Sequence, residues 1–361
     1  MNLKSEYSYE VDSKEWNNKL LQNKASTVYQ TSNWQEIYKQ AYDSKPIFIT
    51  VMKSNGEILG QLGGIIHKKL FWQDANVFSS FIGDKLNLRT TLNWFHGPII
   101  YDYHNQKEII SEILSCIDKI SKENKVTLVR GISPPLDETL LNEPFNSFNY
   151  TIDPWTTYIT DLTHEQEKLF NSLNKKTRYD IRKSEQQELE FEIATNKKSY
   201  DEFYELKLEA KKRAGQKVKR NPIFFDMHIK LLYKKGYEKL FLARHNEEVI
   251  GGILGVIFNG NIIQHSVGNS STKLLGGPFL TWNAIKWAIN EKYSTFDMAG
   301  VNPFPESSKE ETIDFYKSKW RGKKYTYALY TKIFDKTKSK IASFLKNPVK
   351  SSKKLARNFS V

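Results

Sequence analysis

The chain has 361 residues, of which 39% are hydrophobic and 13% aromatic, a composition that excludes a disordered protein. A single cysteine excludes an internal disulfide and a cysteine-rich metal site, and the seven histidines lack metal-binding spacing, so we expect no metal. The length favours two domains, and the net charge of +13 leaves an anionic partner open.

The N-terminal segment and the apolar runs both argue against secretion or membrane insertion. Residues 1–16 are charged throughout and lack the apolar centre of a signal peptide. The longest apolar run, 249–258, is too short to cross a bilayer. We therefore expect a soluble protein in the cytoplasm.

The same series of elements is predicted twice along the chain. Each half has a strand, a polar turn and a second strand, then a helix, then an apolar strand that ends in glycine and proline. These segments are 46–66, 107–120 and 127–134 in the first half and 239–257, 278–290 and 296–303 in the second. Cys116 falls on the apolar face of the first helix and is expected in the core. A duplicated mixed α/β unit is the economical interpretation, and chance similarity between two α/β halves is the alternative.

Two basic segments lie in the second half. In residues 174–183, Lys175, Arg178 and Arg182 are spaced by three and four and therefore form one stripe of a helix. Such a stripe can bind the phosphate of a substrate, and a solvated helix face is the alternative. Residues 207–220 carry seven basic residues and one acidic residue, which suits contact with a tRNA backbone.

The last 26 residues, 336–361, carry eight basic residues and no acidic one. The rest of the chain has 46 basic and 41 acidic residues, a net charge of only +5. Ile341, Phe344 and Leu345 form a short apolar stripe beside the lysines, a pattern that suits an anionic membrane surface. We expect peripheral contact with the inner face of the membrane; a frayed, solvated terminus is the alternative.

Seven segments, taken in order, resemble the FemAB family of nonribosomal aminoacyltransferases over nearly the whole chain. They are "VYQTSNWQEIYK" (28–39), "NWFHGPIIY" (93–101), "TTYITDL" (156–162), "LNKKTRYDIRKS" (173–184), "LFLARHNEEVIGGIL" (240–254), "FDMAG" (296–300) and "DFYKSKWRG" (314–322). The resemblance implies an α/β (α+β) fold with two tandem GNAT-like acyltransferase domains, each a mixed sheet flanked by helices. We expect the domains at 1–155 and 156–335, followed by the tail at 336–361.

The resemblance also implies site residues. Lys317 matches the family's lysine beside the reacting carbonyl, with Tyr316 in place of the usual phenylalanine. Arg321 and Gly322 stand where the family has paired glycines. The opening segment contributes Trp34 and Lys39 as substrate-binding residues, beside the Lys175, Arg178 and Arg182 stripe.

The chemistry of amine acylation gives Lys317 and Asp297 possible roles. An amine that attacks an ester or thioester produces a tetrahedral oxyanion and must lose a proton. Lys317 can stabilise the oxyanion, and Asp297, at the end of a strand, can accept the proton. The alternatives are a solvated Lys317 and an Asx-turn at Asp297.

The donor depends on residues 267–282. In CoA-dependent members of the GNAT fold, a glycine-rich turn before a helix binds the pyrophosphate. Lys273, Gly276 and Gly277 occupy that place, but Pro278 lacks an N–H and instead suits a helix start, which weakens the case for CoA.

The predicted function is transfer of an amino acid from aminoacyl-tRNA to a phosphorylated cell-envelope (peptidoglycan) precursor, with no cofactor. One alternative is an N-acyltransferase that uses acyl-CoA as donor and acts on a small molecule or surface glycan. A second alternative is a noncatalytic module that binds an anionic ligand.

Overall fold

The computed structural model describes residues 2–68, 90–213, 215, 221–335, 337 and 338. The predicted tail stripe at Ile341, Phe344 and Leu345 and most of the C-terminal part of the basic segment 207–220 lie outside these residues. The chain forms two compact units, Met1–Asp153 with Ala328–Val361, and Pro154–Tyr327. The expected second domain extended to residue 335, whereas here β13 (Lys323–Ile333) starts in the second unit and ends in the first, because Leu329–Ile333 pair with β6.

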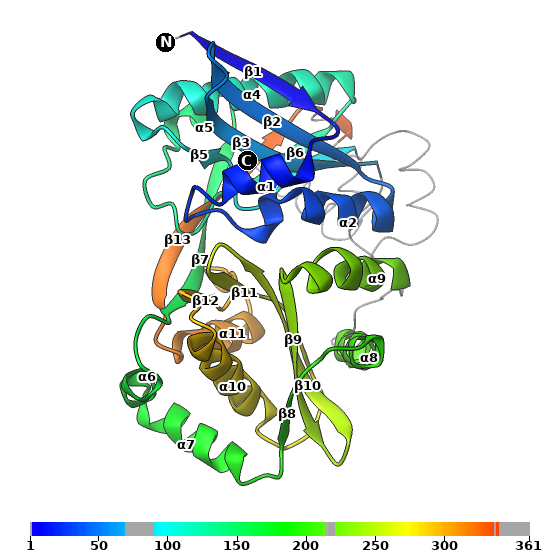
Figure 1. The fold of residues 1–361 in the computed structure, drawn as a ribbon, viewed down its shortest axis with the longest axis vertical. Helices are drawn as coiled ribbons and strands as arrows, with labels where there is room; N and C mark the ends of the chain where they lie inside the picture. Colours follow the sequence, from blue (N-terminus) through cyan, green and yellow to red (C-terminus); the bar gives the residue numbers. More distant parts are fainter. Residues whose placement is uncertain (1, 69–89, 214, 216–220, 336, 339–361) are drawn as a thin grey trace, which may run out of the picture. The chain divides into compact units, whose positions relative to one another are not determined.

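The first unit contains a mixed sheet with the strand order β1-β2-β3-β4-β6-β13 (Figure 1). Its strands are β1 (Leu3–Ser8), β2 (Lys45–Lys53), β3 (Ile58–His67), β4 (Thr91–Trp94), β5 (Ile99–Ile100), β6 (Leu128–Ile132) and the end of β13. Its helices are α1 (Ser13–Leu20), α2 (Ser32–Tyr42), α4 (Gln106–Glu123) and α5 (Glu143–Ser147), with short 3-10 turns at Val28–Gln30 and Tyr103–Asn105. Helix α4 buries an apolar face of isoleucines and leucine at helical spacing against β1, β2 and β3. Cys116 lies on this face and is buried, as predicted.

The second unit contains a sheet with the order β7-β12-β11-β10-β9-β8 (Figure 1). Its strands are β7 (Thr151–Asp161), β8 (Glu190–Ile193), β9 (Glu238–His245), β10 (Glu248–Phe258), β11 (Asn261–Asn269), β12 (Thr295–Asp297) and the start of β13. Its helices are α6 (Gln166–Ser172), α7 (Lys175–Glu185), α8 (Lys197–Arg213), α9 (Pro222–Leu231), α10 (Gly276–Asn290) and α11 (Ser308–Ser318), with a 3-10 turn at Tyr233–Lys235.

Alternation along the strands of the second unit creates a core on each face of its sheet. Phe241 and Ile253 pack with α10, whereas Leu242 and Leu254 pack with α8 and α9. Figure 1 shows α10 and the pair α8 and α9 on opposite sides of the sheet. Successive side chains of β9 and β10 therefore contact different helices on the two faces of the sheet.

The two units repeat one arrangement. Each has an antiparallel hairpin, β2–β3 in one and β9–β10 in the other. Each also has a helix that joins two parallel strands, with α4 between β4 and β6 and α10 between β11 and β12. The duplicated mixed α/β unit predicted from the sequence is confirmed.

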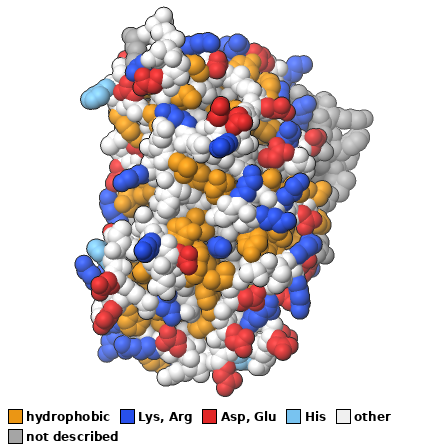
Figure 2. Space-filling model, in the orientation of Figure 1, with side chains coloured by type: hydrophobic (Ala, Val, Ile, Leu, Met, Phe, Trp, Pro, Cys, Tyr) orange, Lys and Arg blue, Asp and Glu red, His pale blue; other side chains and the backbone are white. Residues whose placement is uncertain are grey.

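Charges of both signs are mixed on the face of the molecule shown in Figure 2. On the face in Figure 2, basic and acidic side chains are interspersed and form no continuous basic surface. This agrees with the small excess of 46 basic over 41 acidic residues before residue 336. Across the described residues, no helix is long and apolar enough to cross a membrane.

Candidate active site

Asp297 is the last residue of β12, and its pair with Ile263 is the last between β12 and β11. Its carboxylate is buried and accepts hydrogen bonds from the Thr157 hydroxyl and, at 2.8 Å, from the Ala299 N–H. The second bond closes an Asx-turn, so the structural role proposed for Asp297 is present. Burial raises the pKa of Asp297 to about 6, and the two donors and the charge of Lys317 limit the rise. Such a carboxylate can exchange a proton near neutral pH.

Lys317 lies in the last turn of α11 and is half-buried. Its ammonium donates hydrogen bonds to the carbonyl oxygens of Ala299 at 3.0 Å and Gly300 at 3.1 Å, directly after β12. Burial lowers its pKa to about 8, against the opposing charges of Asp297 and Asp314. Because an ammonium has three N–H donors, these two bonds leave one donor for a ligand. Lys317 is therefore fixed in place, unlike a solvated surface lysine.

The sequence before Lys317 explains why α11 begins where it does. Ser307 caps the helix by accepting a hydrogen bond from the Glu310 N–H at 3.3 Å. The Glu310 carboxylate in turn accepts bonds from the Glu306 N–H at 3.0 Å and the Asn302 side chain at 3.1 Å. These contacts tie the loop after β12 to the start of α11, which helps to hold Lys317 near the end of β12.

Gly300 allows two large side chains to approach this backbone. A Cβ at position 300 would overlap the hydroxyl of Tyr327 and the indole of Trp155. Burial raises the pKa of the Tyr327 hydroxyl, and the charge of the nearby Asp297 carboxylate raises it further. The candidate site therefore combines an acid, a cation and two aromatic side chains around the end of β12.

Tyr316 connects α11 with the first turns of α10. Its hydroxyl is hydrogen-bonded to that of Thr281 at 2.9 Å, and a Cβ at Gly277 would lie 3.4 Å from it. Helix α10 starts at Gly276, and Pro278 lies in its first turn, as predicted. No side chain caps the helix among the described residues, so the Gly276 and Gly277 N–H groups are not bonded by a capping side chain.

The remaining predicted donor residue lies on the loop before α10. Lys273 is exposed on this loop. The loop is held by the Leu275 N–H, which donates to the Gln187 side chain at 2.7 Å. Gly276 and Gly277 are therefore the first residues of α10, the helix that Tyr316 contacts through Thr281, whereas Lys273 is exposed on the loop before it. A role of these three residues in binding the donor stays a prediction.

The predicted basic stripe lies on α7, which packs against α10. Arg178 donates hydrogen bonds to two carbonyls at the C-terminal end of α6, at 2.7 and 3.0 Å, so its guanidinium already caps that helix. Arg182 and Lys175 are exposed. The Arg182 guanidinium lies over the ring of Phe170, 5.4 Å from its centre. Phosphate binding by the stripe stays a prediction.

The two substrate-binding residues expected in the first unit have different environments. Trp34 is 1% exposed and packs against the rings of Tyr29 and Tyr38, so it is a core residue of this unit. Lys39 is partly exposed and forms ion pairs of 3.6 and 3.7 Å with two glutamates. Their participation in substrate binding stays a prediction.

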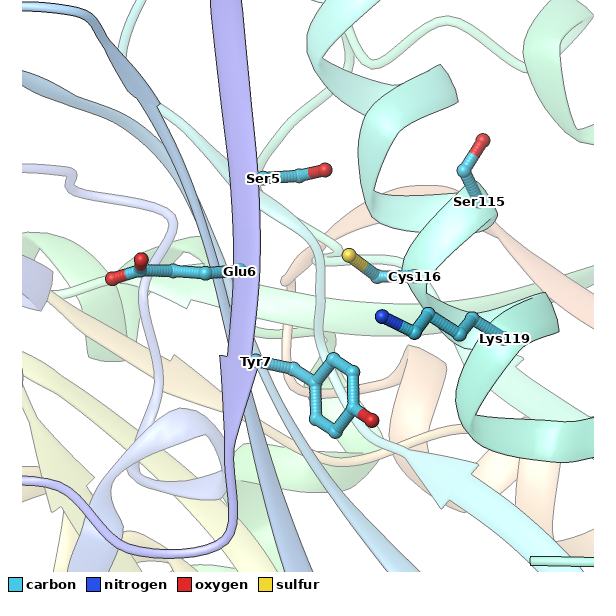
Figure 3. Close-up of a pocket in the computed structure, with 6 residues that line it drawn as sticks. All are labelled: Ser5, Glu6, Tyr7, Ser115, Cys116 and Lys119. Carbon is cyan, nitrogen blue, oxygen red and sulfur yellow. The ribbon is translucent and has the colours of Figure 1, made fainter. Parts of the chain in front are cut away.

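A pocket of about 480 Å³ lies between β1 and α4 of the first unit (Figure 3). It is lined by Ser5, Glu6, Tyr7, Ser115, Cys116 and Lys119. Figure 3 shows Glu6 pointing to the opposite side of β1 from Tyr7 and Lys119. Ser5 already donates to Glu112 at 2.6 Å, and none of the predicted site residues lines this pocket. We assign no chemistry to it.

Three residues near Asp297 were not predicted. Thr157 and Trp155 come from β7, and Tyr327 comes from β13. The alternation in "TTYITDL" is the available signal for Thr157, because it places that residue on one face of a strand. The partners of that face come from residues distant in the sequence and could not be read from it.

The family profile described as "Acetyltransferase (GNAT) domain" matches residues 171–317. No curated protein matches the sequence. Among solved structures, FemX is similar with a TM-score of 0.67 and 14% identity, over 90% of this chain and 96% of that chain. L-PGS from Bacillus licheniformis gives 0.55 and 11%, over 93% and 96%.

A tandem GNAT protein from the clavulanic acid biosynthesis pathway is also similar, with a TM-score of 0.55 and 9% identity over 91% of this chain and 98% of that chain. This relative has the tandem arrangement that the repeated strand and helix order indicates here. Residues 171–317 therefore match the acetyltransferase (GNAT) domain family, and the chain shares its fold with FemX and with a tandem GNAT protein.

Proposed function

We propose that the protein transfers an aminoacyl group from aminoacyl-tRNA to an amine of a phosphorylated cell-envelope precursor. The observation that carries this proposal is the half-buried Lys317 ammonium, held at the end of β12 by the carbonyls of Ala299 and Gly300. A fixed cation beside a buried carboxylate supplies the two groups that amine acylation requires. The fold similarity to FemX and to L-PGS supports the same class of reaction.

In the proposed reaction, the amine attacks the ester carbonyl of the donor, and the carbonyl oxygen becomes an oxyanion. The remaining N–H of Lys317 stabilises this oxyanion, and Asp297 accepts the proton that the amine loses. Collapse of the intermediate forms the amide and breaks the ester C–O bond. The ribose oxygen leaves as an alkoxide and becomes a hydroxyl by taking the proton that Asp297 accepted from the amine. With a pKa of about 6, Asp297 is mostly ionised at neutral pH and can take part in this transfer.

The choice of tRNA over acyl-CoA rests on two features. Pro278 removes one N–H from the first turn of α10, so this turn offers an incomplete cradle for a pyrophosphate. The segment 207–220 has seven basic residues against one acidic residue, a composition suited to a nucleic-acid backbone. Acyl-CoA is the alternative donor, because Gly276 and Gly277 still present N–H groups at the helix start.

The decisive experiment measures both donors on one preparation of the full-length protein. Filter binding with tRNA should show a log–log salt dependence of about 0.7–0.9 per phosphate contacted. Calorimetry with acetyl-CoA should show weak binding. Tight acetyl-CoA binding without salt-sensitive tRNA binding would favour the acyl-CoA alternative, and binding of either donor with no transfer to any amine would favour a noncatalytic module.

A further inference from the structure

Strand β1 stands at one end of the strand order, and its outer edge is a surface that the candidate active site does not use. From Leu3 to Ser8 the strand pairs with β2 on one side only. Among the described residues, its backbone groups form no hydrogen bond with the backbone of any other segment. The outer edge therefore presents unpaired N–H and C=O groups to which a further strand can add.

The side chains of β1 alternate between the two faces of the sheet. Leu3, Ser5 and Tyr7 are half-buried on the face that α4 covers. Lys4 and Glu6 are exposed on the other face, where the ammonium lies 3.3 Å from the carboxylate. Figure 3 shows Glu6 directed away from the side of β1 on which Tyr7 lies. The exposed face of this edge strand therefore carries one charge of each sign, two residues apart.

This charge pattern selects one register for antiparallel pairing of β1 with the β1 strand of a second copy. Directly opposite residues share a face of the sheet, where unlike charges stabilise the pairing and like charges destabilise it. With Ser5 opposite Ser5, Lys4 of each copy is opposite Glu6 of the other. A shift of two residues places either Lys4 opposite Lys4 or Glu6 opposite Glu6. A shift of one residue turns one copy over and sets charged residues opposite half-buried ones.

Strand β8, at the other end of the strand order, lacks this complementarity. Its four residues include Glu190 and Glu192 and no basic residue. Glu192 is already paired with Arg244, whose Nε lies 2.5 Å from the carboxylate. Pairing of β8 with its own copy would therefore bring like charges together. A lysine on an edge strand commonly prevents unwanted pairing, and Lys4 does so in the shifted registers while its partner Glu6 permits one register.

We propose that two copies of the chain associate through β1, in the register that sets Ser5 opposite Ser5 and Lys4 opposite Glu6. The sheet of the first unit then continues across a two-fold axis at Ser5, with both α4 helices on the same face. Main-chain hydrogen bonds between the two strands provide the affinity, and the two charge pairs fix the register. The proposal does not depend on the identity of the acyl donor or on transfer activity.

The test is sedimentation velocity of the full-length protein, without an added N-terminal tag, over a range of concentrations. The unmodified protein should show a reversible monomer–dimer equilibrium. Glu6→Lys or Lys4→Glu alone replaces two attractive pairs by repulsive ones and should weaken association by about tenfold or more. The double variant Lys4→Glu, Glu6→Lys restores opposite charges and should recover the wild-type dissociation constant. Glu167→Lys, an exposed position in α6 with the same change of net charge as Glu6→Lys, should leave it unchanged.

Disulfide cross-linking tests the register directly. Opposite residues of antiparallel strands have Cα atoms about 4.5–5.5 Å apart, a distance that a disulfide can bridge. In a Cys116→Ala background, which removes the chain's single cysteine, Ser5→Cys should give a covalent dimer under mild oxidation. Lys4→Cys should give far less, because the two copies of this position lie diagonally, about 7–8 Å apart.

The outcomes separate association through β1 from any other result. A monomer at every concentration, dissociation constants that ignore both charge reversals, no recovery in the double variant, or equal cross-linking at positions 4 and 5 would overturn the proposal. Lys4 and Glu6 are exposed, so the charge variants test association without disturbing the core. The concentration series uses the unmodified protein and holds even if the cysteine variants do not fold.

Discussion

Replacement of Lys317 by alanine is the sharpest test of the proposed reaction. The change removes the ammonium that donates to the Ala299 and Gly300 carbonyls, together with the third N–H assigned to the oxyanion. Loss of one preorganised oxyanion donor costs about 2.7–4 kcal/mol, or roughly 100- to 1,000-fold in kcat. Lys317→Arg keeps the charge but replaces a compact ammonium by a planar fork, so we expect only partial recovery.

The assay is single-turnover transfer with the donor that the binding measurements identify, which separates the chemical step from product release. Lys309→Ala is the matched control, because Lys309 is an exposed lysine on the same helix. Thermal unfolding of each variant shows whether the fold survives the loss of the two carbonyl bonds. Wild-type kcat in a folded Lys317→Ala protein would refute the assignment of Lys317 to the oxyanion.

Three further predictions follow from the site and the tail. The pH profile of kcat should be bell-shaped, rising as Asp297 ionises near pH 6 and falling as Lys317 loses its proton near pH 8. Asp297→Asn should abolish the rise on the acid side, and an unchanged rise would exclude Asp297 as the proton acceptor. Arg178→Ala should lower the free energy of unfolding by about 1–3 kcal/mol, because the hydrogen bonds to the α6 carbonyls are lost. Arg182→Ala, at an exposed position, should change the free energy of unfolding by less than about 0.5 kcal/mol and should raise the acceptor KM. Chemical denaturation measures the stabilities and steady-state kinetics the KM, and equal stability of the two variants would contradict the capping role of Arg178. Removal of residues 336–361 should weaken binding to anionic vesicles by up to about 1 kcal/mol per basic residue, and cosedimentation that is equal with and without the tail would exclude it as an anchor.

The repeated elements were predictable because each one carries a local pattern. The hairpins alternate with period two around polar turns, and α4 presents apolar residues at helical spacing, with Cys116 among them. Glycine and proline after β12 mark the end of that strand and so place Asp297 at its terminus. The boundary between the units was harder to predict from the sequence, because β13 joins the first unit only through its pairing with β6, which lies about 200 residues earlier.

The site was partly predictable for the same reason. Lys317 stood out through its motif, whereas the Thr157 hydroxyl bonds to Asp297 across 140 positions and no local pattern reports such a contact. Arg178 shows a second limit. A basic stripe on a helix looks the same in sequence whether it binds phosphate, faces solvent or caps a neighbouring helix. Only the position of the α6 carbonyls identifies the third role.

The short segment from Lys317 to Tyr327 explains how a departure from the family pattern is accommodated. Arg321 has a left-handed backbone (φ 61°), which costs about 1 kcal/mol or more for a residue other than glycine, and its guanidinium donates to the Ser172 carbonyl at 2.8 Å. Gly322 is different, because a Cβ there would lie 2.8 Å from the backbone of Ile159. Position 321 therefore requires only a left-handed backbone, which a residue other than glycine can adopt at some cost. Position 322 requires glycine, because the backbone of Ile159 leaves no room for a Cβ. That packing fixes the start of β13 against β7, and so helps to position the Tyr327 hydroxyl beside Gly300, whose carbonyl holds Lys317.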